Sequence, residues 1–182
     1  PIACGAASFF NVDQSTPTEA VVTNQDDTST TASVTVASEA GDTVFAALAA
    51  IDGLDTITAD PSQNSHWNNS VNASGTSADV RGGGSSEPGA ASTVNSWTSV
   101  DSDWAMVGLN INQDNTPTPT PTSTNTPTFT PTATNTPNPN SAAFVVAASG
   151  SAGAASTTCT FNINPGSGAN KLLLVGVTLE DN

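Results

Sequence analysis

Apolar and polar residues alternate in short stretches along most of the chain, which is the pattern of β-strands. Residues 31–38 place Ala32, Val34 and Val36 between small polar residues, the period of a half-buried strand. Residues 44–51 are apolar throughout. Their alanines favour a helix, but the short length, the flanking Gly and Asp and the strand-like neighbours favour a strand that is buried on both faces.

Further strand-like segments follow at about one per ten residues, a spacing typical of a β-sandwich. They are residues 57–59, 90–100, 104–111, 142–148, 157–163 and 171–179. Asp-Ser-Asp at 101–103 predicts a hairpin turn, and Asn-Pro-Gly-Ser-Gly at 164–168 predicts a second turn. Residues 62–88 are polar and Gly-rich, which indicates either a functional loop or a plain surface excursion with Trp67 packed on the sandwich. The predicted class is all-β, a jelly-roll or immunoglobulin-like sandwich.

A low-complexity tract divides the chain into residues 1–112, 113–140 and 141–182. Thr occupies every even position from 116 to 136, and Pro occupies many odd positions, so we expect an extended polyproline II linker. Thr beside Pro at this spacing also resembles mucin-like stalks with O-linked sugars, the alternative being an unmodified linker. The candidate O-glycan sites are Thr116, Thr118, Thr120, Thr122, Thr124, Thr126, Thr128, Thr130, Thr132, Thr134 and Thr136.

The charge balance is strongly acidic, because sixteen Asp and Glu residues against Lys171 and Arg81 give a net charge of −14. Two cations cannot form a basic patch, so we expect no nucleic-acid partner. No apolar run approaches the roughly 18 residues of a membrane-spanning helix, so we expect no membrane span. The start, Pro-Ile-Ala-Cys, has neither Met nor a signal-peptide pattern, which suggests a mature or internal fragment.

Residue types that carry chemistry are scarce. His66 is the sole imidazole, and no nucleophile elbow or phosphate-binding glycine motif accompanies it, so we expect no enzyme. We expect acidic neighbours such as Asp26 with Asp27, and Asp101 with Asp103, to be solvated turn charges. Calcium needs about six to eight oxygen ligands, and it is the only metal or cofactor that we leave open.

Two parts of the chain match parts of one known module. The first is residues 168–177, Gly-Ala-Asn-Lys-Leu-Leu-Leu-Val-Gly-Val. The second is residues 5–111, with Ala-Ala-Ser-Phe-Phe near the start and Trp-Ala-Met-Val-Gly-Leu near the end. They resemble the early strands and the later half of a β-sandwich module found, often in tandem, in exported and surface-anchored bacterial proteins. The Thr/Pro-rich linker is similar to linkers in envelope proteins of some filamentous bacteria. The resemblance implies a surface location more than an activity.

The order of the two halves is rotated, since the later strands of the module come first. The chain is then a piece of a tandem array, or it closes on itself through the linker, or residues 141–182 complete the sandwich of the next subunit. We favour the last arrangement, in which head-to-tail strand donation builds a polymer. The donated strands would carry Phe144, Val145, Val146, Phe161, Ile163, Leu172, Leu173, Leu174, Val175 and Val177.

Cys4 and Cys159 form an even pair, which in an exported protein predicts a disulfide, either within the chain or between chains; two free buried thiols are the alternative. The expected function is a structural subunit of an extracellular filament or surface assembly, with copies of itself as partners. The alternative is a secreted carbohydrate-binding or adhesion module. Trp67 is its candidate stacking residue, because Trp97 and Trp104 lie in predicted strands and should be buried.

Overall fold

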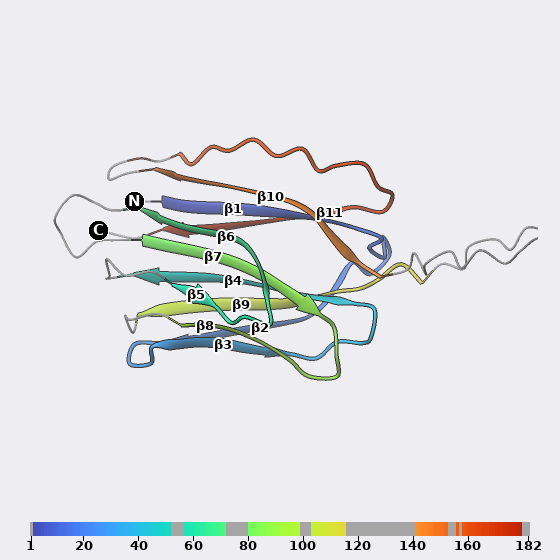
Figure 1. Ribbon diagram of the computed structural model, residues 1–182, viewed down its shortest axis with the longest axis horizontal. Coiled ribbons are helices and arrows are strands. Elements are labelled where there is room, and N and C mark those ends of the chain that lie inside the picture. Colours follow the sequence, from blue (N-terminus) through green and yellow to red (C-terminus); the bar gives the residue numbers. More distant parts are fainter. Residues whose placement is uncertain are drawn as a thin grey trace, which may run out of the picture.

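A computed structural model describes residues 2–51, 57–71, 80–98, 103–115, 141–152, 156 and 158–179. These residues form strands and no helix, so the all-β prediction is confirmed. The strands are β1 (Ile2–Phe10), β2 (Thr18–Asp26), β3 (Thr31–Val36), β4 (Thr43–Ile51), β5 (Thr58–Ala59), β6 (Asn64–Val71), β7 (Val80–Pro88), β8 (Thr93–Thr98), β9 (Trp104–Ile111), β10 (Ala143–Ala152) and β11 (Leu172–Leu179). They pair in three antiparallel sheets that stack as the layers of a β-sandwich (Figure 1).

The middle layer, which we call the inner sheet, has the strand order β2-β9-β4-β7-β6. Its central strand β4 is covered on both faces, as the unbroken apolar run predicts. Val44 and Leu48 belong to the core on one side of the sheet, and Phe45 belongs to the core on the other. The inner sheet therefore needs a covering layer on each face.

The lower sheet has the order β3-β8-β5 and packs on one face of the inner sheet. The core between them holds Trp97 and Trp104, which are buried as expected. The predicted hairpin between residues 90–100 and 104–111 is wrong, although both segments form strands. β8 pairs with β3 and β5, whereas β9 pairs with β2 and β4, so the chain changes layer between them. A turn signal indicates a reversal of the chain and leaves open the sheet in which the next strand pairs.

The upper sheet has the order β10-β1-β11 and covers the other face of the inner sheet. β1 is buried along nearly its whole length, because strands flank both of its edges, the inner sheet packs on one face and a further segment covers the other. Residues 158–170, which form no strand, run across its outer face (Figure 1). The prediction of a strand at 157–163 is therefore wrong for the described residues of that segment. It is held to the sheet by the Cys4–Cys159 disulfide and by a hydrogen bond of 3.4 Å that Ser8 Oγ donates to the carbonyl of Pro165.

The strands after the linker complete the sandwich of their own chain, because β10 and β11 both pair with β1. Within one chain β10 and β11 thus take the intrachain arrangement, whereas donation of residues 141–182 to a neighbouring chain stays a prediction. Residues 116–140 lie outside the described residues, and with them all of the candidate O-glycan sites.

The expected loop at residues 62–88 is also corrected, since most of this segment forms β6 and β7. The glycines of β7 explain why a polar, Gly-rich sequence makes a strand. A Cβ on Gly84 would lie 2.4 Å from the ring of Trp67, and a Cβ on Gly83 would lie 2.9 Å from the ring of Trp97. The bare backbone of β7 therefore lets an indole ring pack on each of its faces, that of Trp67 from the adjacent strand β6 and that of Trp97 from β8 of the lower sheet.

Candidate docking edge

β11 is an edge strand, paired along one side with β1 and along the other with no described strand. Its side chains alternate between the two faces of the upper sheet. Leu172 and Leu174 pack inward on the core that the upper sheet shares with the inner sheet. Leu173, Val175 and Val177 remain 47%, 58% and 59% exposed. A single strand thus presents both a free backbone edge and a row of aliphatic side chains.

The row is exposed because the covering segment 158–170 lies over β1 and β10. Its contacts reach Ser8 and Cys4 on β1, and a Cβ on Gly150 of β10 would lie 2.7 Å from the carbonyl oxygen of Thr160. The covering segment does not extend over β11, so the outward side chains of β11 stay exposed.

A groove runs beside the free edge of β11. The upper sheet has three strands and the inner sheet has five, so β9 and β2 extend beyond β11 as a shelf. The groove holds about 690 Å³ and has Ala47, Ala105 and Val107 among its lining residues, with Val175 and Val177 on the side of β11. Val107 is 36% exposed, so this part of the inner sheet has no cover among the described residues.

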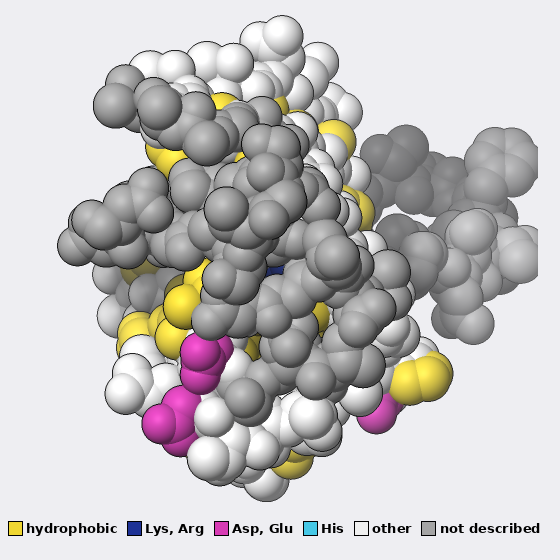
Figure 2. Space-filling view, turned by 90° about the vertical axis from the view of Figure 1, so that its left-hand side faces the viewer, with side chains coloured by type: hydrophobic (Ala, Val, Ile, Leu, Met, Phe, Trp, Pro, Cys, Tyr) yellow, Lys and Arg dark blue, Asp and Glu magenta, His cyan; other side chains and the backbone are white. Residues whose placement is uncertain are grey.

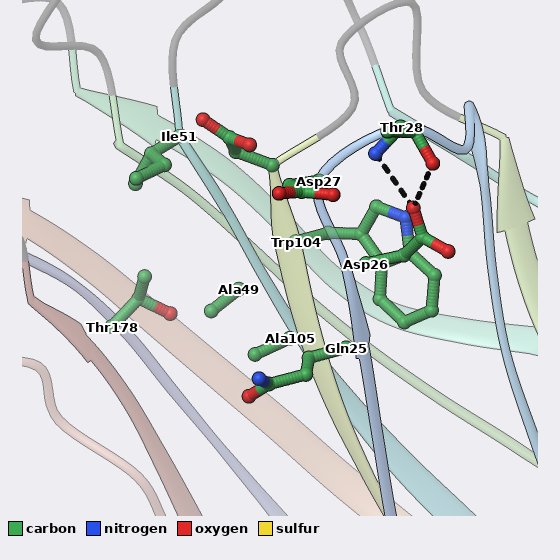
Figure 3. A pocket seen from close by; sticks show the side chains of 10 residues that line it. Gln25, Asp26, Asp27, Thr28, Ala49, Ile51, Trp104, Ala105 and Thr178 are labelled. Carbon is green, nitrogen blue, oxygen red and sulfur yellow. Dashed lines mark hydrogen bonds between the residues drawn. The ribbon is translucent and has the colours of Figure 1, made fainter.

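A second cavity of about 580 Å³ continues the groove, because both are lined by Gln25, Ala49, Ala105 and Thr178. Figure 3 shows the two alanines and Thr178 on one side and the acidic residues of the β2–β3 turn on the other. The end view of the molecule in Figure 2 likewise shows acidic side chains next to hydrophobic ones.

The acidic end of the groove is formed by Asp26, Asp27 and Asp103. Thr28 donates to Asp26 Oδ1 from its hydroxyl at 2.8 Å and from its amide at 2.6 Å. These bonds, together with one from the amide of Ser29, stabilise the carboxylate and hold the pKa of Asp26 below its ordinary value of 3.8. The end of the groove is therefore negatively charged at neutral pH.

The disulfide predicted from the sequence is confirmed. Cys4 and Cys159 are joined within the chain, with Cα atoms 6.5 Å apart and a separation of 155 residues in sequence. The bond fastens the segment after the linker to β1. Among the described residues no cysteine is left free.

The predicted assembly residues fall into three groups. Leu173, Val175 and Val177 form the exposed row of β11, whereas Leu172 and Leu174 face inward. Phe144, Val145 and Val146 lie on β10, and Phe161 and Ile163 lie in the covering segment.

Trp67 is 6% exposed, so the expectation that it is the free indole of the three is wrong. Its ring fills the space between the layers, where a Cβ on Gly5 of the upper sheet would lie 2.3 Å from it. A buried ring offers no platform on which a sugar could stack. The flanking polar residues suggested a surface loop because they line the exposed side of an edge strand, β6.

His66 lies at the contact between β6 and β10. Its ring stacks on that of Phe144 with centroids 3.9 Å apart, and its Nε2 is 2.8 Å from Ser86 Oγ. Burial lowers the pKa of His66 to about 4, so the ring is neutral at neutral pH. The described residues contain no group of three His, Cys, Asp or Glu side chains that could hold a metal ion.

A comparison of the chain with protein-family models, with curated proteins and with solved structures found no match. In the part of the chain that the structure describes, no helix is long and apolar enough to cross a membrane.

The sequence reveals the apolar character of β11 but not its exposure. Six of the eight residues from Leu172 to Leu179 are aliphatic, which predicts a strand buried on both faces. The shelf was missed for a similar reason, since Ala105 and Val107 belong to β9, a strand that looks like ordinary core.

Proposed function

We propose that this chain is a structural subunit of an extracellular filament or surface assembly, in which copies join by adding a β-strand to the free edge of β11. The observation that carries the proposal is the exposed row Leu173, Val175 and Val177 beside an open groove. Free edges are normally shielded by charge, by Pro or by a covering segment, and β11 has no charged residue along its length. An added strand would satisfy its backbone groups and pack beside its exposed side chains.

The energies support association through this edge. Covering an aliphatic side chain that is about half exposed is worth about 1 kcal/mol, so about 3 kcal/mol is the ceiling for the row, and a strand beside β11 gains part of it by packing on the flanks of these side chains. Backbone hydrogen bonds along the edge add to this. The net charge of −14 opposes contact between copies, and salt screens that repulsion. We therefore expect assembly to strengthen as ionic strength rises.

The disulfide supports an extracellular location, since such bonds persist in oxidising compartments. A disulfide within the chain also means that each copy keeps all three of its sheets when copies join. In this proposal the copies join through a surface edge and keep β10 and β11 on their own β1.

The test compares two single substitutions in the full chain, Val175→Asp in β11 and Val94→Asp in β8. Val175 and Val94 are 58% and 50% exposed, and Val94 lies on the lower sheet, away from the groove. Light scattering and electron microscopy over a series of salt concentrations should show assemblies for the unchanged chain and for Val94→Asp. Val175→Asp should stay monomeric, because a carboxylate on the edge opposes strand addition. Equal behaviour of the two variants, or a chain that stays monomeric at every salt concentration, would contradict the proposal.

A further inference from the structure

The groove beside β11 has the shape of a missing strand. β1 and β10 follow β11 on one side, while on the other side the shelf of β9 and β2 continues beneath empty space. A strand placed there would pair with β11, extend the upper sheet and cover Ala105 and Val107. Neighbouring strands lie about 4.8 Å apart in a sheet, so one added strand lies directly over the adjoining part of the shelf.

The shelf also limits what can occupy the groove. Two folded copies cannot pair their β11 edges in one continuous sheet, because β9 and β2 of each copy project under the place that the other copy needs. The occupant must be an extended segment with no sheet of its own beneath it.

β10 and β11 do not meet this condition. Both pair with β1, and the Cys4–Cys159 bond fastens the chain between them to the same strand. The longest stretch outside the described strands is the Thr/Pro tract.

We propose that the Thr/Pro tract, residues 116–136, of a second copy docks in this groove as an added strand. The inference rests on the proposed function and names the segment that one copy gives to the next. The tract has 21 residues and β11 has eight, so part of the tract suffices to pair along the whole edge and the rest is available to span between copies.

The phase of the prolines fits an edge strand. All seven prolines between Thr116 and Asn140 stand at odd positions, and no even position from 116 to 136 holds anything but Thr. In an extended strand the N–H and C=O groups of successive residues point to opposite sides. The missing donors would therefore all lie on the side away from β11, and every even residue would keep the N–H that pairs with the edge.

The side chains fit as well. In one of the two strand directions, residues whose backbone faces β11 direct their side chains outward, and the odd residues then face the shelf. The odd-numbered prolines, Phe129 and Ala133 would lie on Ala105 and Val107 of the shelf, and the Thr hydroxyls would remain at the surface. The tract carries no charge, so it adds no repulsion to the acidic end of the groove.

The test uses the full chain at low salt and labelled synthetic peptides of residues 120–128, because every eight-residue window of this peptide contains positions 124 and 125. One peptide has the natural sequence, one carries Thr124→Pro at an even position, and one carries Asn125→Pro at an odd position. Each variant peptide gains one proline, and the two positions are adjacent in sequence, so the two peptides are matched in proline content and in chain stiffness. Fluorescence anisotropy should show saturable binding of the natural peptide, a loss of about tenfold or more in affinity for Thr124→Pro, and a change within about twofold for Asn125→Pro.

The site is checked with substitutions in the full chain. Val107→Asp on the shelf should weaken binding of the natural peptide by about tenfold or more, and Val94→Asp on the lower sheet should leave it unchanged. The inference is overturned if no peptide binds, if the two proline peptides weaken equally, or if the two Asp variants behave alike. If the chain's own tract fills the groove and the added peptides therefore do not bind, the inference is overturned as well.

A full-chain variant that combines Thr120→Pro, Thr124→Pro, Thr128→Pro and Thr132→Pro, which leaves no eight-residue window of the tract without an even-position proline, separates this inference from the proposed function. If that variant still assembles while Val175→Asp does not, the edge joins copies through another segment and only the tract is excluded. If the peptides bind in the required pattern but the full chain never assembles, the groove takes the tract and the polymer proposal fails.

Discussion

Removing the disulfide should strongly lower the stability of the folded chain. The bond joins residues 155 positions apart, so it closes a very long loop in the unfolded chain. In the chain-entropy account, a loop of this length lowers the entropy of the unfolded state by about 17 cal/mol/K, which is about 5 kcal/mol at room temperature. A loss of that size is comparable with the whole free energy of unfolding of many domains.

The variants are Cys4→Ala and Cys159→Ala, measured by urea unfolding against the oxidised chain. Each single change opens the same loop, so both should lower the free energy of unfolding by nearly the same amount. At a typical slope of about 2 kcal/mol per molar urea, the midpoint should fall by about 2 M or more. The slope itself should rise, because an open chain exposes more surface on unfolding.

Two results would refute this reasoning. A loss below about 1 kcal/mol would mean that the unfolded chain gains little freedom when the bond is removed, as when residual structure already holds its ends together. A monomer band that shifts to a ladder on non-reducing electrophoresis of the natural chain would show that the cysteines bond between chains instead.

Two further predictions concern the contact between the layers. Gly84→Ala should lower the free energy of unfolding by about 1–3 kcal/mol, because the new methyl group meets the ring of Trp67. Gly82→Ala should lower it less, because the nearest neighbours of its new methyl group are 3.3 Å away. Equal losses of the two variants in thermal unfolding would contradict the packing account. Stability should fall as pH drops from 6.5 toward 4, because the folded state keeps the pKa of His66 at about 4 and protonation therefore favours unfolding. The ceiling is roughly 3 kcal/mol, and partial exposure of the ring reduces it to about 1 kcal/mol. A His66→Phe variant should lose this part of the pH dependence, and an unchanged urea-midpoint profile would argue against it.

Local pattern alone predicts the strands whose side chains match it, and it predicts little of how they pair. β3, β4, β9 and β11 follow from alternation or from unbroken apolar runs, and the disulfide follows from an even pair of cysteines. β7 does not follow, because Gly is depleted in strands, and the glycines of β7 are explained only by the rings of Trp67 on β6 and Trp97 on β8 that pack against it.

The docking edge could be predicted even less. Whether Val175 and Val177 are buried depends on which strand lies beyond β11, and that is a property of the whole topology. Sequence reasoning also placed Trp67 at the surface, since the polar residues beside it are indistinguishable from a loop until β6 is seen to be an edge strand.

The composition links the three-layer fold to the open groove. Small side chains let the layers approach a sheet that is covered on both faces, and accordingly four of the nine residues of β4 are Ala and five of the nine residues of β7 are Gly or Ser. β9 and β2 extend beyond the upper sheet, and there a small side chain such as that of Ala105 does not fill the space above it. Larger residues there would have closed the surface of the monomer. The small ones leave a channel with an unpaired strand along one wall, and the same chain carries an uncharged tract whose prolines all share one phase.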